Sequence, residues 1–147
     1  MRISSAHDVV HWEAAAAAIQ AAARRAEEVG VKVNIAVVDA GGNLAGFLRM
    51  PGAFLHSIDI AIDKAYTAAG FGIPTAEWGP ALQQHSEAVR NGIPLRPRMV
   101  CFGGGLPFWH EGRLIGGIGV SGGTEEEDEE CARAGLEARR SGRARRR

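Results

Sequence analysis

The sequence predicts an α+β fold in a single domain, and two patterns carry that prediction. Strand-forming segments are joined in pairs by short glycine-containing turns, which favours an antiparallel sheet over the parallel sheet of β-α-β units. Longer segments with apolar residues at helical spacing lie before, between and after these pairs. With 147 residues, the chain has the size of one domain. Helices packed on an antiparallel sheet are therefore the expected architecture.

The first half of the chain is expected to fold as helix, β-hairpin and helix. The expected elements are a helix from Ser5 to Glu28, strands over residues 31–38 and 44–50, and a helix over residues 53–70. Ser5 and Asp8 have the spacing of a capping box at the start of the first helix. The run 31–38 is β-branched and almost entirely apolar, which is typical of a strand buried on both faces. The turn 39–43 contains glycines, so the next strand is expected to return beside the first.

The second half is expected to add further strands and a final helix. In chain order it should contain a short helix capped by Thr75, a loop over residues 91–98, strands over residues 99–102, 106–110 and 113–120, and a helix that begins after Thr124. Glu111 and Gly112 form the turn of a second predicted hairpin. Thr124 and Glu127 have capping-box spacing, and the acidic residues around them suit the positive end of a helix dipole. The predicted sheet therefore has five strands.

The charge distribution separates a basic tail from an acidic body. The chain has 17 basic and 17 acidic residues, but six of the arginines fall within residues 139–147, which contain no acid. We expect one domain over residues 1–138 and a disordered, solvated tail over residues 139–147. A basic tail is able to touch nucleic acid, but the remaining body is acidic and carries no nucleic-acid-binding motif, so no such partner is expected.

The composition indicates neither a membrane protein nor a disulfide-stabilised one. No apolar run approaches the roughly 18 residues of a membrane span. The N-terminus is largely polar where a signal peptide would be apolar, so a cytoplasmic location is expected. Cys101 and Cys131 are the cysteines of the chain, and a reducing compartment would keep both as thiols.

Three segments with glycines or charges at fixed positions form one pattern along the chain. They are Ile35–Leu44 with Arg49 and Met50, Ser57–Ala65 with residues 67–69, and Phe102–Pro107 followed by Gly112, Ile115–Thr124 and residues 128–129. In order and spacing they resemble the GlcG/HbpS family of haem-binding and haem-degrading proteins, which is related to the PduO C-terminal domain. The resemblance extends over most of the chain from Val31 to Leu136, and three segments in register are far more specific than any one of them.

The resemblance implies a profilin-like α/β/α sandwich, in which the five-stranded antiparallel sheet would lie between helices. It also implies haem as the ligand and a homo-oligomer, either an octamer or a smaller even-numbered assembly. The chain departs from the family pattern at Leu48, at Pro51, in the arginine-rich loop 90–98 and at Phe108–His110. These departures surround the expected pocket, so the identity of the ligand stays open.

Histidines are the first candidate ligands, because haem iron is commonly held by an imidazole. His7 and His11 are four residues apart in the first predicted helix, so they are expected to share one face. Some members of the family that the chain resembles have an axial histidine in the N-terminal region, which favours these two as haem ligands. A solvated start of a helix is the alternative explanation for both.

Asp59, Lys64 and Arg49 are the candidate catalytic residues. Asp59 and Lys64 belong to the second of the three segments and lie in a predicted helix that is otherwise largely apolar. A buried charge needs a partner, so the two side chains either stabilise the fold or an interface, or they shape a pocket. Arg49 ends a predicted strand, where it could bind a carboxylate through two hydrogen bonds.

Two glycine-rich stretches supply a candidate binding site for an anion. The candidate residues are Gly103, Gly104, Gly105, Ser121, Gly122 and Thr124. Bare backbone N–H groups at the start of a helix, with hydroxyl groups beside them, could bind a carboxylate or a haem propionate. Tight turns and close strand packing explain the same glycines equally well.

These residues support three hypotheses for function. The first is a protein that binds haem or a similarly flat ligand at a subunit boundary, for sensing, storage or degradation. The second is a cofactor-independent enzyme, an isomerase, hydratase or decarboxylase that acts on a small carboxylate by acid–base chemistry. The third is a structural accessory subunit without a ligand.

Overall fold

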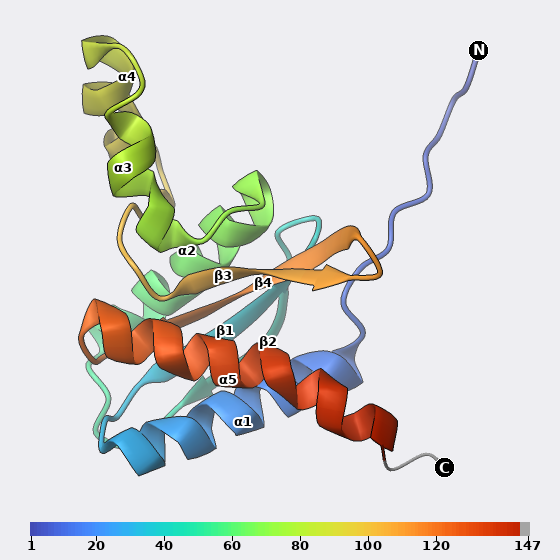
Figure 1. Cartoon of the computed structure of the whole chain (residues 1–147), viewed down its shortest axis with the longest axis vertical. Helices are drawn as coiled ribbons and strands as arrows, with labels where there is room; N and C mark the ends of the chain where they lie inside the picture. The colour runs from blue at the N-terminus through green and yellow to red at the C-terminus, as the bar shows by residue number, and fades with distance from the viewer. Residues whose placement is uncertain (145–147) are drawn as a thin grey trace.

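Residues 1–144 are described by a computed structural model of the chain, in which helices cover a central sheet (Figure 1). Its elements, in chain order, are α1 (Trp12–Val29), β1 (Asn34–Asp39), β2 (Leu44–Arg49), α2 (His56–Phe71), η1 (Thr75–Glu77), α3 (Trp78–Leu82), α4 (Glu87–Gly92), η2 (Ile93–Leu95), β3 (Gly105–His110), β4 (Arg113–Ser121) and α5 (Glu125–Ala144). No helix among the described residues is long and apolar enough to cross a membrane. Helix α5 enters the predicted basic tail, and residues 145–147 lie outside the described residues. The domain boundary at residue 138 and the disorder of the tail stay predictions.

The sheet is antiparallel, as predicted, but it has four strands instead of five, in the order β2-β1-β4-β3. Both predicted hairpins are present, and β1 pairs with β4 at the centre of the sheet. The strand predicted over residues 99–102 was wrong. The backbone N–H of Val100 donates to the hydroxyl of Thr67 on α2, 3.1 Å away, so a helix side chain takes the hydrogen bond that a neighbouring strand would have accepted.

Helices cover both faces of this sheet (Figure 1). Helices α1 and α5 lie side by side on one face, over a continuous apolar core that includes Ile35 and Ile118. Helix α2 lies on the other face, where its small residues Ala61 and Ala65 pack against β1. The segment from η1 to η2 projects from the body as an arm (Figure 1). The predicted loop 91–98 belongs to this arm and is partly helical, because it includes the end of α4 and all of η2.

Glycines in β4 allow α2 to lie directly against the sheet. A Cβ atom on Gly119 would overlap the carbonyl oxygen of Ala61, and a Cβ atom on Gly117 would overlap the carbonyl oxygen of Ala65. The helix backbone therefore occupies the space that two side chains would need. This contact fixes the position of α2, and with it the buried side chain of Lys64, relative to β4.

The first helix begins at Trp12 with His11 as its N-cap, so the start predicted at Ser5 was wrong. The segment before His11 is not helical. The backbone N–H of Val10 donates to the carbonyl of Ile115 in β4, 3.0 Å away. Bonding to a strand requires extended backbone, so this tertiary contact prevails over the local capping signal.

The last helix begins as predicted. The hydroxyl of Thr124 accepts the backbone N–H of Glu127 at 3.2 Å, and the carboxylate of Glu127 accepts the backbone N–H of Thr124 at 2.9 Å. The predicted capping box is therefore confirmed. Both of its partners lie within four residues of each other, so a local pattern is enough to specify it.

Gly119→Ala is expected to destabilise the fold by at least about 1–3 kcal/mol, the usual cost of an overpacked core, because the added methyl group meets the backbone of α2. Gly70→Ala is the matched control, since Gly70 lies within α2 and a Cβ atom there meets no atom within 4 Å. The control should be neutral or stabilising by up to about 1 kcal/mol, because alanine is the better helix former. Urea denaturation followed by circular dichroism measures both. Equal stability of Gly119→Ala and the wild type would contradict the close packing of α2 on β4.

Candidate functional site

A pocket of about 480 Å³ lies between the N-terminal segment and the β3–β4 hairpin. It is lined by His7, Asp8, Val9, His11, Ala14, Phe108, His110 and Ile115. The volume lies within the usual range for small-molecule sites, and a lining of apolar side chains with a few polar groups is typical of a site that binds an organic ligand.

Strand β3 supplies one wall of the pocket. Phe108 and His110, two positions apart on the strand, both line the cavity. Trp109 between them has its ring near Gly72, at the C-terminal end of α2. Phe108 is buried and His110 is exposed, so this wall has an apolar base and an imidazole toward the solvent.

The N-terminal segment supplies the other wall. Beyond the backbone bond to β4, a carboxylate oxygen of Asp8 pairs with Nη1 of Arg113 at 2.8 Å. These two contacts hold the segment along the hairpin. The prediction that His7 and His11 share a helix face was wrong, because the segment that carries them is not helical before Trp12, but both histidines line the pocket.

The two N-terminal histidines differ in how their imidazoles are engaged. The Nδ1 atom of His11 accepts the backbone N–H of Glu13 at 3.2 Å and thereby caps α1. A neutral imidazole that accepts at Nδ1 carries its proton on Nε2, so metal binding through Nε2 would break the cap. No hydrogen bond of this kind engages His7 within the described part of the chain. His7 is therefore the better candidate of the two for binding a metal centre.

The histidines of the pocket do not form a site for a bare metal ion. Within residues 1–144, no group of three or more histidine, cysteine, aspartate or glutamate side chains is placed to hold one.

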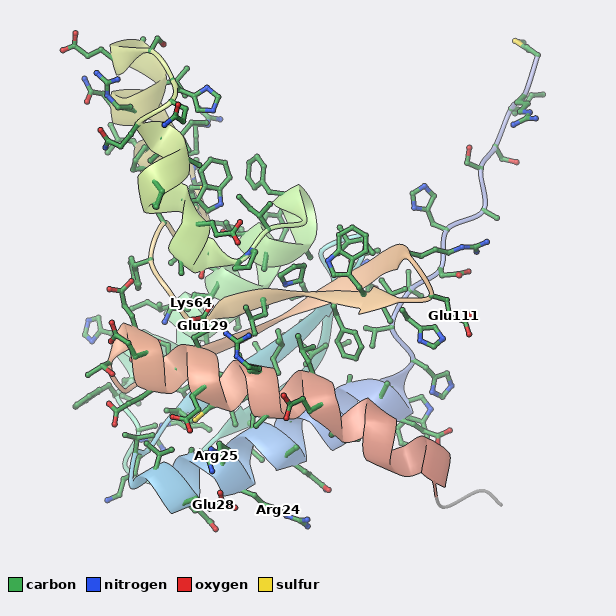
Figure 2. The ribbon with its side chains drawn as sticks, viewed as in Figure 1. Arg24, Arg25, Glu28, Lys64, Glu111 and Glu129 are labelled. Carbon is green, nitrogen blue, oxygen red and sulfur yellow. The ribbon has the colours of Figure 1, made fainter. Side chains whose placement is uncertain are left out.

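Lys64 lies where α2 approaches the start of α5 (Figure 2). Its Nζ atom donates to the carbonyl of Val120 at 2.8 Å and to Oδ2 of Asp128 at 3.1 Å. Burial lowers the pKa of Lys64 and raises the pKa of Asp128, and the attraction between the two charges offsets part of each shift. The side chain of Lys64 is 1% exposed, so it stabilises this junction and is closed to a substrate.

The three predicted catalytic residues do not converge. Asp59 is exposed on α2, whereas Lys64 is enclosed between two helices. Arg49 is exposed at the end of β2 and donates from Nη2 to the carbonyl of Ala53 at 2.8 Å. None of the three lines the pocket described above.

The two glycine-rich stretches lie beside each other, since the N–H of Val120 donates to the carbonyl of Gly104, and side chains of the protein bind several of their N–H groups. The N–H of Gly103 donates to Oε1 of Glu125 at 2.7 Å, and the N–H of Gly105 donates to Oγ1 of Thr75 at 2.9 Å. The N–H of Thr124 is bound in the capping box. The predicted anion site stays a prediction, and an anion there would have to compete with these internal acceptors.

Residues 10–137 match the family model of the haem-degrading proteins described as HbpS-like. The chain belongs to this HbpS-like family. The resemblance inferred from the three sequence segments is thereby confirmed. Among solved structures, the PduOC:haem complex has a TM-score of 0.81 with this chain at 34% identity, and the match covers 88% of this chain and 94% of that one.

Relatives of this HbpS-like chain differ in length. An uncharacterized 15.0 kDa protein of Citrobacter freundii is 42% identical over 118 residues, which cover 80% of this chain and 83% of that protein. The corrinoid adenosyltransferase PduO of Citrobacter freundii is 40% identical over 119 residues, which cover 81% of this chain but 36% of PduO. The chain thus spans about a third of PduO.

Sequence patterns do not single out the apolar base of the pocket in this HbpS-like chain. Phe108 and Ile115 lie in predicted strands, and a buried strand residue has the same pattern whether it faces a core or a cavity. The one available signal was the departure from the family pattern at Phe108–His110. That departure marks the wall that β3 contributes.

Lys64→Met is expected to destabilise the protein by about 3–5 kcal/mol, because it leaves the buried carboxylate of Asp128 without its partner. Asp128→Asn keeps an acceptor for the N–H of Gly123, which lies 2.8 Å from Oδ1, but it should cost a similar amount by leaving the ammonium unpaired. The double variant should lose less stability than the sum of the two single variants. Chemical denaturation of the four proteins gives this coupling, and strictly additive losses would argue against a direct ion pair.

Proposed function

We propose that this HbpS-like chain binds haem in the pocket between the N-terminal segment and β3. The observation that carries the proposal is the lining, in which three histidines accompany an apolar base formed by Phe108 and Ile115. A porphyrin requires an apolar cavity for its ring and an axial ligand, commonly an imidazole, for its iron. The similarity to PduOC, which has been solved as a complex with haem, supports the same assignment.

Each part of the pocket has its own proposed task. His7 would hold the haem iron from the N-terminal wall, since its imidazole is not used as a helix cap. Phe108 and Ile115 contact the porphyrin ring. Arg113, which pairs with Asp8 of the pocket lining, would keep the N-terminal wall in place. Bound haem supplies an iron centre whose axial ligands and surroundings set its redox potential.

The proposed role is sensing, storage or degradation of haem by a cytoplasmic homo-oligomer, an octamer or a smaller even-numbered assembly. Val9 lines the pocket with 53% of its surface exposed, and Trp12, beside His11, is 68% exposed. Apolar side chains this exposed near a pocket favour a second subunit covering its edge. Haem would then lie at a subunit boundary.

An acid–base enzyme is not the favoured function. The three residues of this hypothesis lie in different surroundings: Asp59 and Arg49 are exposed, whereas Lys64 is buried. Acid–base catalysis requires the acidic and the basic side chain to reach the same part of the substrate. A ligand-free accessory subunit is the alternative that the following experiment separates from a haem-binding protein.

Titration of the purified chain with ferric haem is expected to give a shifted Soret band that saturates at a stoichiometric amount. His7→Ala should weaken binding by at least about tenfold, since losing even an outer-shell partner of a metal ligand has an effect of this size. His56→Ala, which removes an exposed histidine of α2 outside the pocket, should leave the affinity unchanged. Haem should also raise the Tm of the wild type, because a ligand that binds the native state stabilises it.

A spectrum identical to that of free haem, together with an unchanged Tm, would overturn the proposal and favour the accessory subunit. A Tm that rises with small carboxylates but not with haem would instead support the enzyme hypothesis.

A further inference from the structure

We propose that residues 1–9, which we call the strap, open and close one wall of the pocket. Val10 is the hinge of this motion, and the ion pair between Asp8 and Arg113, which we call the latch, keeps the strap closed. The proposal rests on the proposed function, since haem is the ligand that would enter the pocket. The motion itself is a property of the protein without haem, so it can be measured separately.

The strap supplies a distinct part of the pocket lining. His7, Asp8 and Val9 belong to the strap. The remaining lining comes from α1, from its N-cap and from the β3–β4 hairpin, and consists of His11, Ala14, Phe108, His110 and Ile115. Helix and sheet hydrogen bonds fix these elements. Movement of the strap would therefore remove one wall and leave the apolar base and the opposite wall in place.

Burial changes abruptly between Val9 and Val10. Val10 is 5% exposed, packs in the core beneath α1, and donates its N–H to the carbonyl of Ile115 at 3.0 Å. Every residue from Met1 to Val9 is exposed, and this end of the chain extends away from the sheet and helices (Figure 1). A segment without buried side chains gains little to offset the entropy cost of being ordered. The chain is thus anchored at Val10 and weakly held before it.

The latch is the contact that ties the strap to the hairpin. Within residues 1–138, it is the one polar interaction of the strap with the rest of the chain, and it joins Oδ2 of Asp8 to Nη1 of Arg113 at 2.8 Å. The side chains are 56% and 69% exposed, so dissolved salt screens the pair and its contribution is small. A contact this weak closes the strap and still permits frequent opening.

A latch has a kinetic signature that a simple binding contact lacks. If the strap must open for haem to enter and to leave, loss of the latch accelerates association and dissociation by similar factors, and Kd changes little. A residue that only contacts the bound ligand acts mainly on the dissociation rate. The ratio of the two rate changes therefore separates these roles.

The two latch residues also separate strap opening from charge attraction. Haem propionates are anionic, so loss of the Arg113 cation would slow association by electrostatics alone, whereas loss of the Asp8 carboxylate would accelerate it. Loss of the latch predicts acceleration in both variants. The sign of the change in Arg113→Gln is thus decisive.

The first experiment measures backbone motion in the protein without haem, by ¹⁵N relaxation of wild type and Arg113→Gln. In the variant, the order parameters of residues 7–9 should fall below about 0.6, the range of flexible backbone. Val10 and α1 should keep their wild-type values, since Val10 is buried and bonded to β4. Arg113 is exposed, so its replacement should leave the Tm unchanged.

The second experiment follows binding of ferric haem by stopped-flow absorbance, and its release to an excess of a second haem acceptor. Arg113→Gln and Asp8→Asn should each accelerate both steps by up to about fivefold, the range that an exposed ion pair allows. The double variant should be no faster than either single variant. In about 1 M salt, where charges are screened beyond about 3 Å, the wild type should approach the variants.

Arg133→Gln is the matched control. It removes an exposed arginine that pairs with Glu129 on α5, outside the pocket, so both haem rates and the order parameters of the strap should equal those of the wild type.

The outcomes distinguish this inference from the proposed function. Slower association in Arg113→Gln, or equal order parameters for residues 7–9 in wild type and variant, would overturn the latch while leaving haem binding intact. Failure of the wild type to bind haem would overturn the proposed function, and the relaxation data would still decide whether the strap opens at Val10.

Discussion

The close contact between α2 and β4 supports the rest of this structure. Gly117 and Gly119 leave room for the helix backbone, and the same packing brings the ammonium group of Lys64 to the carbonyl of Val120 and the carboxylate of Asp128. The ion pair joins α2 and α5, which cover opposite faces of the sheet. An unpaired buried charge is so costly that other placements of α2 are strongly disfavoured. The ion pair therefore favours one defined position of α2 relative to the sheet and α5.

This contact also positions the candidate haem site. Strand β4 pairs with β1 on one side and β3 on the other, so holding β4 against α2 also holds the wall that β3 contributes. On the opposite face of the sheet from α2, Ile115 of β4 lines the pocket, and its carbonyl receives the N–H of Val10 from the N-terminal segment. One strand thus serves as the base for helix packing and as the attachment point for both walls of the pocket.

Membership of the HbpS-like family accounts for the core of this protein better than for its pocket. Lys64 and the glycines of β4 lie within the family pattern, and both are used for packing. The pocket differs in this respect: His7 precedes residue 10, where the family match begins, and the wall that β3 contributes lies in a segment that departs from the pattern. A shared core with a variable cavity lets related chains keep one fold while their ligands differ.

Several interactions between neighbours in the sequence were predicted correctly, because the pattern contains both partners, although the capping box predicted at Ser5 was not formed. The hairpin turns, helix α2 and the capping box of α5 are of this kind. Interactions between distant segments decided the remainder. Because the N–H of Val10 donates to the carbonyl of Ile115, the first helix begins later in the chain than predicted. The N–H of Val100 donates to Thr67 on α2, and residues 99–102 do not form a fifth strand. The pocket belongs to the same class: no spacing pattern relates His7 to His110, because only the folded sheet and the segment laid along it bring these two imidazoles to one cavity.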